Sequence, residues 1–436
     1  MILRAVRAEL DARLAPGEAF AVALSGGRDS VVLLDVLLRE ARHRVRGAIH
    51  VHHGLSPNAD AWASFCETLC GERGLPLAVR RVAVERGPQT SLESEARRAR
   101  YEALAGAARS FGVATVALAH HRDDQAETLL LQLLRGAGPR GLASMPAMRD
   151  DASGVRWWRP LLAVPRTEID AYARHRGMGW VDDESNEAVH HARNAIRHVV
   201  MPALVAVNAN AGVTLARAAG HQAEAARLAD DLAAIDAREA FDGATLSQQA
   251  LSALPAHRAR NLLRWFLRAR GLPAPSTARL GAMHAQLRAA RGDAALRLCH
   301  AGVEIGLYKG RIHVHEPAPL PYEIDWDARQ GLALPHGTLE VEEAVGQGID
   351  ADRVRGAALR VRPRSGGERM QLAGNRPRRA LKHILQEAGL PPWQREALPL
   401  VTLGSALVAV PGVGVDAAWQ APPQGRGLVL TWHPGR

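Results

Sequence analysis

A short run of small and polar residues near the N-terminus has the composition of an anion-binding loop. The run is Ser25-Gly26-Gly27-Arg28-Asp29-Ser30, and it lies between apolar segments at 20–24 and 31–34. Its two glycines allow tight backbone curvature, so successive N–H groups can point inward, and the following helix adds its positive end. Ser-Gly-Gly is also a common turn, but strand, loop and helix follow one another in the order that phosphate binding needs. The sequence therefore predicts a phosphate-binding loop at 25–30.

The scarcity of lysine narrows the type of phosphate loop. Of the 55 basic residues only two, Lys309 and Lys382, are lysines, and both are far from residue 30 in the chain. A Walker A loop needs its own lysine, and the dinucleotide-binding pattern G-x-G-x-x-G does not occur at 25–30 either. Both common phosphate loops are therefore excluded at this site.

Two clusters of histidines and carboxylates follow further apolar runs. His52-His53 ends the run at 48–52, and His120-His121-Arg122-Asp123-Asp124 follows the run at 114–119. Ligands of parallel sheets bind at the carboxyl ends of strands, so both clusters are expected near the phosphate-binding loop. Paired histidines can also be ordinary core or surface residues. A metal phosphohydrolase built on the second cluster is an alternative, but it leaves the loop at 25–30 unexplained.

The elements that must hold these groups alternate along the first 200 residues. Apolar runs typical of strands lie at 20–24, 48–52, 77–84 and 114–119. Helical patterns lie between or after them, at about 30–40, 59–73, 92–109 and 124–134. Strands that alternate with helices of this length predict a parallel sheet covered on both faces.

The rest of the chain has a different pattern. Residues 213–291 are mainly helical in periodicity, and 303–315 reads as a hairpin that turns at Lys309-Gly310. Beyond a proline-rich linker, strands are expected at 358–361, 400–403 and 428–431, with one helix at 378–388. The uncharged stretch 397–415 is about long enough for a membrane span, but its prolines and glycines favour two strands around Gly404-Ser405.

Length and composition agree with a protein of several domains. The 436 residues are too many for one core, and 47% apolar with 23% charged residues is ordinary globular usage. We predict domains at 1–212, 213–316 and 317–436. Three cysteines cannot build a disulfide framework and the N-terminus has no uninterrupted apolar signal region, so a cytoplasmic protein without a membrane partner is expected.

The loop motif S-G-G-x-D-S after the first strand resembles the signature of the PP-loop, or N-type ATP pyrophosphatase, superfamily. Further segments resemble one branch of it, the tRNA(Ile)-lysidine synthetases, in order over residues 20 to about 205. These segments are 52–55 with Ala61-Trp62, 95–101, 120–128, and 183–186 with 193–197. A late match, 362–368 with Lys382, Pro391-Pro392-Trp393 and Arg395, resembles the C-terminal module of that family.

The resemblance implies a fold and a reaction. The fold is α/β, with a doubly wound parallel five-stranded sheet like that of the adenine nucleotide alpha hydrolases, then a helical domain and a small α+β C-terminal domain. In the family, the C2 oxygen of the wobble cytidine of a CAU-anticodon tRNA(Ile) attacks the α-phosphate of ATP and releases pyrophosphate. The amine of free L-lysine then attacks C2 and displaces AMP, which changes decoding from AUG to AUA. ATP, Mg²⁺, lysine and this tRNA are the implied ligands, and a homodimer is possible.

The same resemblance assigns roles to residues. Those expected to bind ATP are Ser25, Gly26, Gly27, Arg28, Asp29, Ser30 and His52. Asp29 also faces Mg²⁺ or the incoming amine. A lysine ammonium has an ordinary pKa of about 10.4 and no lone pair at neutral pH, so a carboxylate must hold it and accept its proton. Asp29 and Asp124 are the candidates, with His120 as a partner of the base or the phosphate. Arg97, Arg193 and Arg197 are expected to contact phosphate or the developing charge.

Basic residues gather late in the chain. The formal net charge is +10, and ten basic residues against one acid between 353 and 382 supply +9 of it locally. Such a stretch repels itself unless a polyanion neutralises it, although a solvated charged face is the usual alternative. The residues expected to bind tRNA are Arg362, Arg364, Arg378, Arg379 and Lys382.

Two other functions remain open at this point. An amidating or thiolating relative of the superfamily is disfavoured because the chain has no glutaminase region and no pair of reactive cysteines. Cys66 and Cys70 are four residues apart on one expected helix face, where core packing is the preferred interpretation. An RNA-binding protein on a degenerate ATP fold is disfavoured by the intact Asp29, Ser30 and Asp124.

Overall fold

A parallel sheet forms the centre of the N-terminal half, where the apolar runs predicted it. Five strands run parallel in the order β3-β2-β1-β4-β6, and β5 pairs with β6 as an antiparallel edge. In chain order they are β1 (Phe20–Ala23), β2 (Val45–His52), β3 (Leu77–Arg81), β4 (Thr115–Ala117), β5 (Met148–Asp150) and β6 (Arg156–Trp158). The expected five-stranded parallel sheet is confirmed, and the structure adds a sixth strand.

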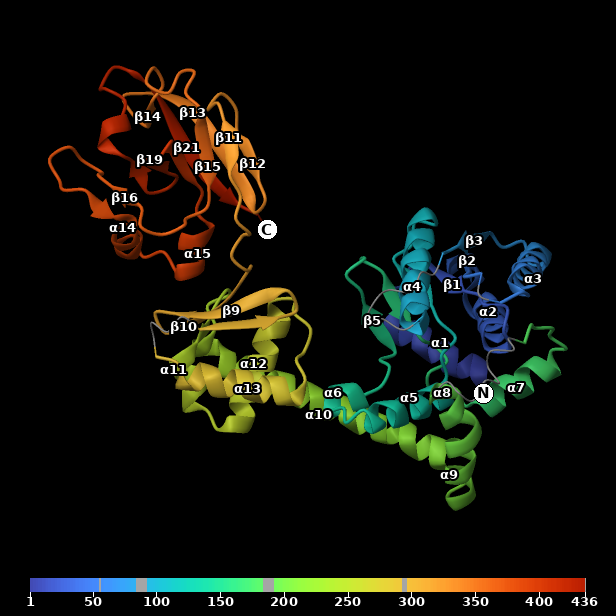
Figure 1. The fold of residues 1–436 in the computed structure, drawn as a ribbon. Helices are drawn as coiled ribbons and strands as arrows, with labels where there is room; N and C mark the ends of the chain where they lie inside the picture. Colours follow the sequence, from blue (N-terminus) through green and yellow to red (C-terminus); the bar gives the residue numbers. More distant parts are fainter. Residues whose placement is uncertain (55, 84–91, 183–191, 292–295, 436) are drawn as a thin grey trace. The chain divides into compact units, whose positions relative to one another are not determined.

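The computed structural model describes residues 1–54, 56–83, 92–182, 192–291 and 296–435. They form two compact units, Met1–Ala229 and Asp230–Arg436, and helix α10 (Ala211–Ala240) runs from the first into the second (Figure 1). The three-domain division expected from the sequence stays a prediction.

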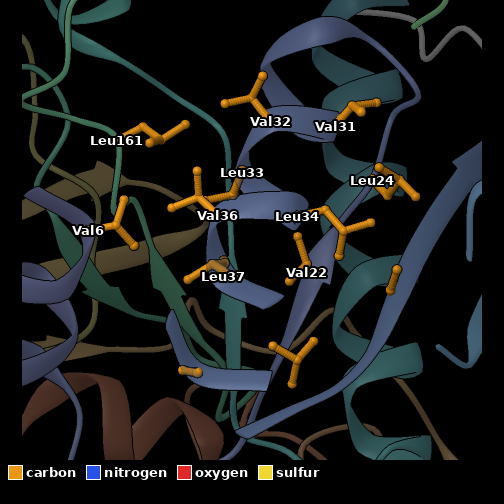
Figure 2. Close-up of a cluster of buried hydrophobic side chains, with 14 of the residues drawn as sticks. Val6, Val22, Leu24, Val31, Val32, Leu33, Leu34, Val36, Leu37 and Leu161 are labelled. Atoms are coloured by element: carbon orange, nitrogen blue, oxygen red, sulfur yellow. The ribbon is translucent and has the colours of Figure 1, made fainter. Parts of the chain in front are cut away.

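Helices cover both faces of the sheet, as a doubly wound fold requires. The helices on one face are α1 (Ile2–Arg13), α2 (Arg28–Ala41), α3 (Ala59–Glu72) and α7 (Arg166–His175), and α4 (Leu92–Ser110) covers the other. Phe20 and Val22 of β1 pack with the first group, whose core is drawn in Figure 2, whereas Ala21 packs with α4. Because side chains alternate along a strand, one short apolar run supplies both layers.

The strand order places a ligand site. The sheet extends from β1 to β2 and β3 on one side and to β4 and β6 on the other, so a switch point lies between β1 and β4. Ligands of such sheets bind at the carboxyl ends of the strands next to the switch point. The loop at 25–30 follows β1, and the cluster at 120–124 follows β4. The fold therefore brings together the two groups singled out in the sequence.

The second unit begins with helices on an antiparallel sheet of order β7-β10-β9-β8. The predicted hairpin is confirmed, since β9 (Val303–Tyr308) pairs with β10 (Arg311–His315) and the turn residues Lys309 and Gly310 have φ of 47° and 72°. The sequence did not predict β7 (Leu246–Ser247), because two residues carry no periodicity. The remaining elements are β8 (Arg297–His300), α11 (Gln248–Ala253), α12 (Ala256–Ala269) and α13 (Thr277–Ala289).

The C-terminal part contains more strands than the sequence indicated. One sheet has the order β11-β15-β18-β19-β20 and the other β12-β13-β21-β14. The first comprises Ile324–Trp326, Leu359–Arg362, Leu400–Leu403, Ala406–Val410 and Gly414–Val415, and the second Leu332–Leu334, Gly337–Val345, Arg426–Pro434 and Ile349–Asp350. The predicted strands correspond to β15, β18 and part of β21. Strand β13 was missed because its exposed positions include Glu340, Glu342 and Glu343, which hide the apolar alternation.

The predicted helix at 378–388 is shorter than expected. Helix α14 is Leu381–Glu387, because β17 (Arg379–Ala380) pairs with β16 (Arg369–Met370) immediately before it. A further helix, α15 (Pro392–Ala397), leads into β18. The uncharged stretch 397–415 forms strands around Gly404-Ser405, as predicted.

No single helix in the described ranges is long and apolar enough to cross a membrane. The segments Ala192–Val207 and Ala211–Ala240 have the length and apolar composition of a membrane span only when they are taken together. The pair is bent by 99° between them.

Thiol reactivity tests the packing of α3. Burial raises the pKa of Cys66 to about 12 and that of Cys70 to about 11, so both stay protonated at pH 8, whereas Cys299 is exposed. We expect Ellman's reagent to titrate one thiol in the native protein and three in 6 M guanidinium. A Cys299→Ser variant should show none in the native state, and rapid reaction of a second native thiol would contradict the described core.

Candidate active site

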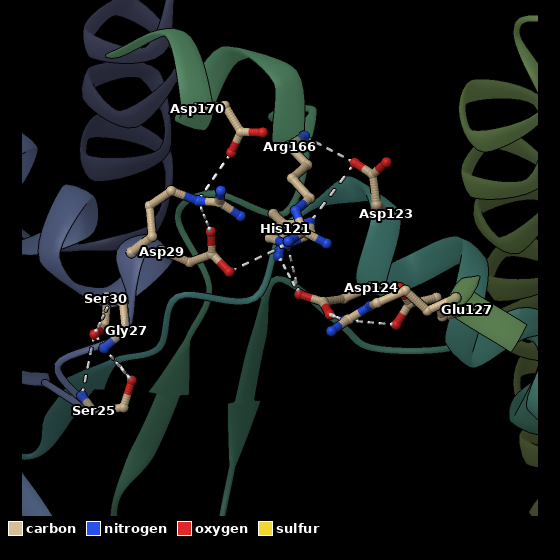
Figure 3. Close-up of polar contacts among 12 residues, drawn as sticks. Ser25, Gly27, Asp29, Ser30, His121, Asp123, Asp124, Glu127, Arg166 and Asp170 are labelled. Carbon is tan, nitrogen blue, oxygen red and sulfur yellow. Dashed lines mark hydrogen bonds and ion pairs between the residues drawn. The ribbon is translucent and has the colours of Figure 1, made fainter. Parts of the chain in front are cut away.

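The loop at 25–30, called the phosphate loop below, is held by its own serines. Ser30 Oγ donates to Gly27 O at 2.8 Å, and it lies 3.1 Å from Ser25 Oγ. Ser25 N donates to Ser30 Oγ at 3.2 Å (Figure 3). Gly26 has φ +88°, and a Cβ there would lie 2.9 Å from Cγ2 of Val181. The curvature expected from the glycines is therefore present, and it leads directly into the first turn of α2.

His121 links the phosphate loop to the helix after β4, α5 (Arg122–Leu134). Its Nε2 lies 3.5 Å from Asp29 Oδ2 and 3.5 Å from Asp124 Oδ2 (Figure 3). Burial alone would lower the pKa of His121, but the hydrogen bond with Asp29 and the charge of Asp124 outweigh burial and raise it. The pKa of Asp29 would rise on burial, but His121 and Arg28 lower it. His121 therefore bridges two carboxylates, which favour its protonated form.

A buried ion network continues from Asp124. Arg193 Nη2 lies 2.8 Å from Asp124 Oδ1, and Arg197 Nη2 lies 3.3 Å from the same oxygen. Glu127, one turn further along α5, pairs with Arg193 Nε at 3.2 Å and Arg197 Nε at 2.7 Å. Asp124 is 8% exposed and Glu127 3%. Burial would raise the pKa of Asp124, but the charges of His121 and Arg193 lower it to about 2.

Two more contacts tie the network to α7. Asp123 accepts a hydrogen bond from the backbone N–H of Arg166 at 2.9 Å, and Arg28 of the phosphate loop pairs with Asp170 at 2.9 Å (Figure 3). Asp123 is therefore engaged at the start of α7. No group of three or more His, Cys, Asp or Glu in the described ranges could hold a metal by itself. The contact of Asp123 with α7 disfavours a phosphohydrolase centre on 121–124.

A cavity of about 620 Å³ lies at the carboxyl ends of β1, β2 and β4, within the usual size range of small-molecule sites. Its lining includes Ser25, Gly27, Arg28, Asp29, Ser30, His50, His53, Arg100, Tyr101, His120, Asp124, Arg166 and Arg197. The cavity therefore joins the phosphate loop to the carboxylates and to α4. His120 is neutral there, because burial and the charges of nearby arginines lower its pKa to about 3 despite Asp124.

Two residues expected at the site lie elsewhere. His52 ends β2 on the side of α3, where Nε2 lies 3.1 Å from Asp60 Oδ1, and the cavity is lined by His50 and His53 instead. The structure therefore does not bring His52 to the cavity, because its strand position directs it to the carboxylate of the next helix. Arg97 is exposed and lies over the Tyr101 ring, with Cζ 5.2 Å from its centroid, while its neighbour Arg100 lines the cavity.

The prediction that the late basic stretch is uncompensated is wrong. Four of the five residues expected to bind tRNA form ion pairs with three carboxylates: Arg362 and Arg364 share Glu368, Arg378 pairs with Asp416, and Arg379 pairs with Glu387. Only Glu368 belongs to the counted stretch. The other acids come from later in the chain, where a local charge count does not include them. Lys382 is exposed and has no acidic partner in the described part of this unit.

The sequence interpretation missed His121 as the bridge and Glu127 as part of the network. The spacing of these residues could have indicated the network. Asp124 and Glu127 are three residues apart, and Arg193 and Arg197 are four apart. On a helix, residues at these spacings share one face. The matched segment 183–186 lies outside the described residues.

Comparisons with known proteins agree with this geometry. A family model described as a PP-loop domain matches residues 4–204, a TilS substrate binding domain matches 246–313, and a TilS substrate C-terminal domain matches 359–432. The tRNA(Ile)-lysidine synthase of Nitrosomonas europaea is 42% identical over 98% of this chain and 94% of its own. The tRNA(Ile)-lysidine synthase of Azoarcus sp. (strain BH72) is 41% identical over 97% of this chain and 93% of its own.

The chain belongs to the tRNA(Ile)-lysidine synthase family. Membership confirms the expected family, the PP-loop domain that uses ATP, and the class of enzyme, a ligase that modifies tRNA. Likeness to solved structures is weaker. The U34-tRNA thiolase NcsA of Methanococcus maripaludis is 18% identical over 50% of this chain and 77% of its own, with a TM-score of 0.43.

Glu127 tests the ion network. Without Glu127, Arg193 and Arg197 share the single charge of Asp124. We therefore expect Glu127→Gln to lower the free energy of unfolding by about 3 kcal/mol, the lower end of the cost of breaking a buried ion pair. The control is Glu102→Gln, at an exposed pair with Arg98, which should cost less than about 1 kcal/mol. Urea titration followed by tryptophan fluorescence measures both. Equal shifts in the two variants would contradict a structural role for the network.

Proposed function

We propose that this chain attaches lysine to C2 of the wobble cytidine in the CAU anticodon of tRNA(Ile), with conversion of ATP to AMP and pyrophosphate. The observation that carries the proposal is the single cavity that joins the phosphate loop to the carboxylates bridged by His121. Family membership supplies the substrate class. A homodimer and a cytoplasmic location stay predictions from the sequence.

The first step is transfer of the adenylyl group. The C2 oxygen of the cytidine forms a bond to the α-phosphorus of ATP, and the bond from that phosphorus to the leaving pyrophosphate breaks. Negative charge spreads over the phosphoryl oxygens as this happens. Arg28 and Asp29, the first residues of α2, line the cavity, and their amides have no partner within the helix. These amides and the Ser25 and Ser30 hydroxyls are the donors that we assign to the phosphates.

Mg²⁺ fits the residues present, with Asp29 as its protein ligand. Asp29 Oδ1 is buried, accepts no hydrogen bond from the described residues and lies 3.7 Å from Arg28 Nε. Mg²⁺ usually takes one or two carboxylates together with substrate phosphates and water, so one carboxylate oxygen without a hydrogen bond beside the phosphate loop is sufficient. The ion would supply positive charge to the phosphates of ATP.

The second step is attack by the lysine amine on C2. A bond forms between the nitrogen and C2, the bond from C2 to the adenylate oxygen breaks, AMP leaves, and the nitrogen gives up a proton. Asp124 is a weak base, since its pKa is about 2 and both of its oxygens are engaged by His121, Arg193 and Arg197. Asp29 is the other candidate acceptor, but His121 and Arg28 lower its pKa as well, and it can take the proton only when it does not hold Mg²⁺. Asp124 attracts the ammonium and holds His121 and Arg193 in place, and neutral His120 contributes hydrogen bonds.

Binding of tRNA by the C-terminal domain needs cations that are free to meet phosphate. Arg369, Arg376 and Lys382 are exposed and have no acidic partner in the described part of this unit. These three residues are therefore better candidates than the paired Arg362, Arg364, Arg378 and Arg379 for strong phosphate contacts. The paired residues would have to exchange a carboxylate for a phosphate.

Asp124 tests the catalytic assignment. We expect Asp124→Asn to reduce lysine incorporation at least about 10²-fold, because the amide no longer attracts the ammonium or holds the cations. Pyrophosphate release and radiolabelled lysine incorporation are measured with tRNA, ATP and lysine each omitted in turn, and circular dichroism checks the fold. The wild type should need all three for lysidine. Full activity in the variant would remove Asp124 from the mechanism.

The free cations test the RNA assignment. We expect Arg376→Glu with Lys382→Glu to weaken tRNA binding at least tenfold and to make the log–log salt dependence shallower by roughly 0.7–0.9 for each phosphate that the variant no longer neutralises. The matched control is Arg355→Glu, at an exposed arginine paired with Asp352. Filter binding between 50 and 300 mM KCl measures both variants. An unchanged affinity and slope in the double variant would refute the assignment.

A further inference from the structure

Four arginines surround Tyr101 beside the cavity. The guanidinium carbons of Arg97, Arg149 and Arg100 lie 5.2, 5.5 and 5.8 Å from the ring centroid. Arg159 interacts with the Tyr101 hydroxyl, to which Arg97 Nη2 also donates at 3.4 Å. These four residues, called the Tyr101 arginine cluster, come from α4, from β5 and from the segment after β6, so the fold assembles them from distant parts of the sequence.

The cluster holds more positive charge than its protein surroundings neutralise. Within the described ranges the one carboxylate paired with it is Asp151, 3.5 Å from Arg149. Arg159 is 2% exposed, its Nη1 donates to Pro146 O at 2.8 Å, and its Nε has no acceptor among the described residues. Buried charges without a partner are costly, and arginine cannot escape that cost by losing its proton. An anion that binds here would remove the imbalance.

The aromatic support of the cluster is rigid. Tyr101 packs edge-on against Trp157, with ring centroids 4.7 Å apart and planes at 82°. Trp157 is 1% exposed and lies in β6. Guanidinium groups that lie over a fixed ring lose little freedom when they bind, and their planar forks match the oxygens of a phosphate. The cluster is therefore preorganised for a phosphate group.

The position of the cluster indicates the source of that phosphate. Arg100 and Tyr101 line the cavity, whereas Arg97 and Arg149 lie over the Tyr101 ring without lining the cavity, a position called the rim below. All three arginines are exposed to solvent. The phosphate loop already provides donors for the phosphates of ATP inside the cavity. The arginines that line the cavity and those at its rim could bind one phosphate together. Such a phosphate fits a ligand that places one nucleotide in the cavity and continues outside it, as a polynucleotide strand does.

We propose that the Tyr101 arginine cluster binds a backbone phosphodiester of the tRNA strand next to the nucleotide whose base enters the cavity. The contact fixes the strand, and the base then reaches the phosphate loop and the bridged carboxylates. The contact specifies position rather than sequence, since every phosphodiester is alike. The inference rests on the proposed function for the identity of the strand.

The test separates tRNA from ATP. The variant is Arg97→Gln with Arg149→Gln, both exposed, and the matched control is Arg98→Gln, an exposed arginine of the same helix that pairs with Glu95 and Glu102. We expect KM for tRNA to rise at least tenfold in the double variant, with KM for ATP unchanged within twofold. The salt dependence of tRNA binding should become shallower by about 0.7 for each phosphate that the double variant leaves unbound. The Arg98→Gln control should match the wild type in KM for tRNA, in KM for ATP and in the salt dependence of tRNA binding.

Arg159→Lys is the second variant, because it replaces the planar guanidinium by an amine whose charge burial can remove. It should raise KM for tRNA more than it lowers kcat, and thermal unfolding checks that it folds. A rise in KM for ATP with unchanged tRNA binding would assign the cluster to ATP and overturn the inference. Unchanged KM values for both tRNA and ATP would overturn it as well. Failure of the proposed function is a separate outcome, in which the wild type binds tRNA but incorporates no lysine.

Discussion

The ion pairs of Asp124 are the interaction on which the geometry of the candidate site depends. A buried carboxylate is stable only where positive groups and N–H donors surround it. Asp124 meets this requirement through His121, Arg193 and Arg197, and His121 in turn reaches Asp29. One charge therefore connects α5, the segment after residue 192 and the phosphate loop. Its pKa of about 2 keeps it ionised at neutral pH.

The cavity presents both signs of charge to its proposed ligands. Asp29 and Asp124 line it from the phosphate loop and α5, together with the arginines Arg28, Arg100, Arg166 and Arg197. A reaction that brings a lysine ammonium to polyanionic ATP and tRNA needs both signs within one cavity. His120 lines the same cavity, and its lowered pKa keeps it neutral, so it adds no charge of its own.

Local patterns in the sequence predicted local structure. The phosphate loop, four parallel strands and the hairpin at 303–315 follow from residue types and spacing over fewer than 15 residues. Strand β6 was missed because Arg156-Trp157-Trp158 is too short and polar at one end to read as an apolar run. Contacts between distant segments were also missed. Asp416 neutralises Arg378 across 38 residues, and His52 meets Asp60 instead of the cavity.

The scarcity of lysine has a consequence beyond the type of phosphate loop. A buried lysine can become neutral when its surroundings penalise its charge, because its pKa falls readily. The guanidinium of Arg159 is subject to the same penalty, since burial and the charges of Arg149 and Arg97 lower its pKa, but the ordinary value of 12.5 leaves it charged near neutrality. The positive charge at Tyr101 is thus permanent, and the protein alone does not neutralise it within the described residues. A site of this kind is complete only when its anion is bound, which makes tRNA part of the electrostatic balance of the cavity as well as its substrate.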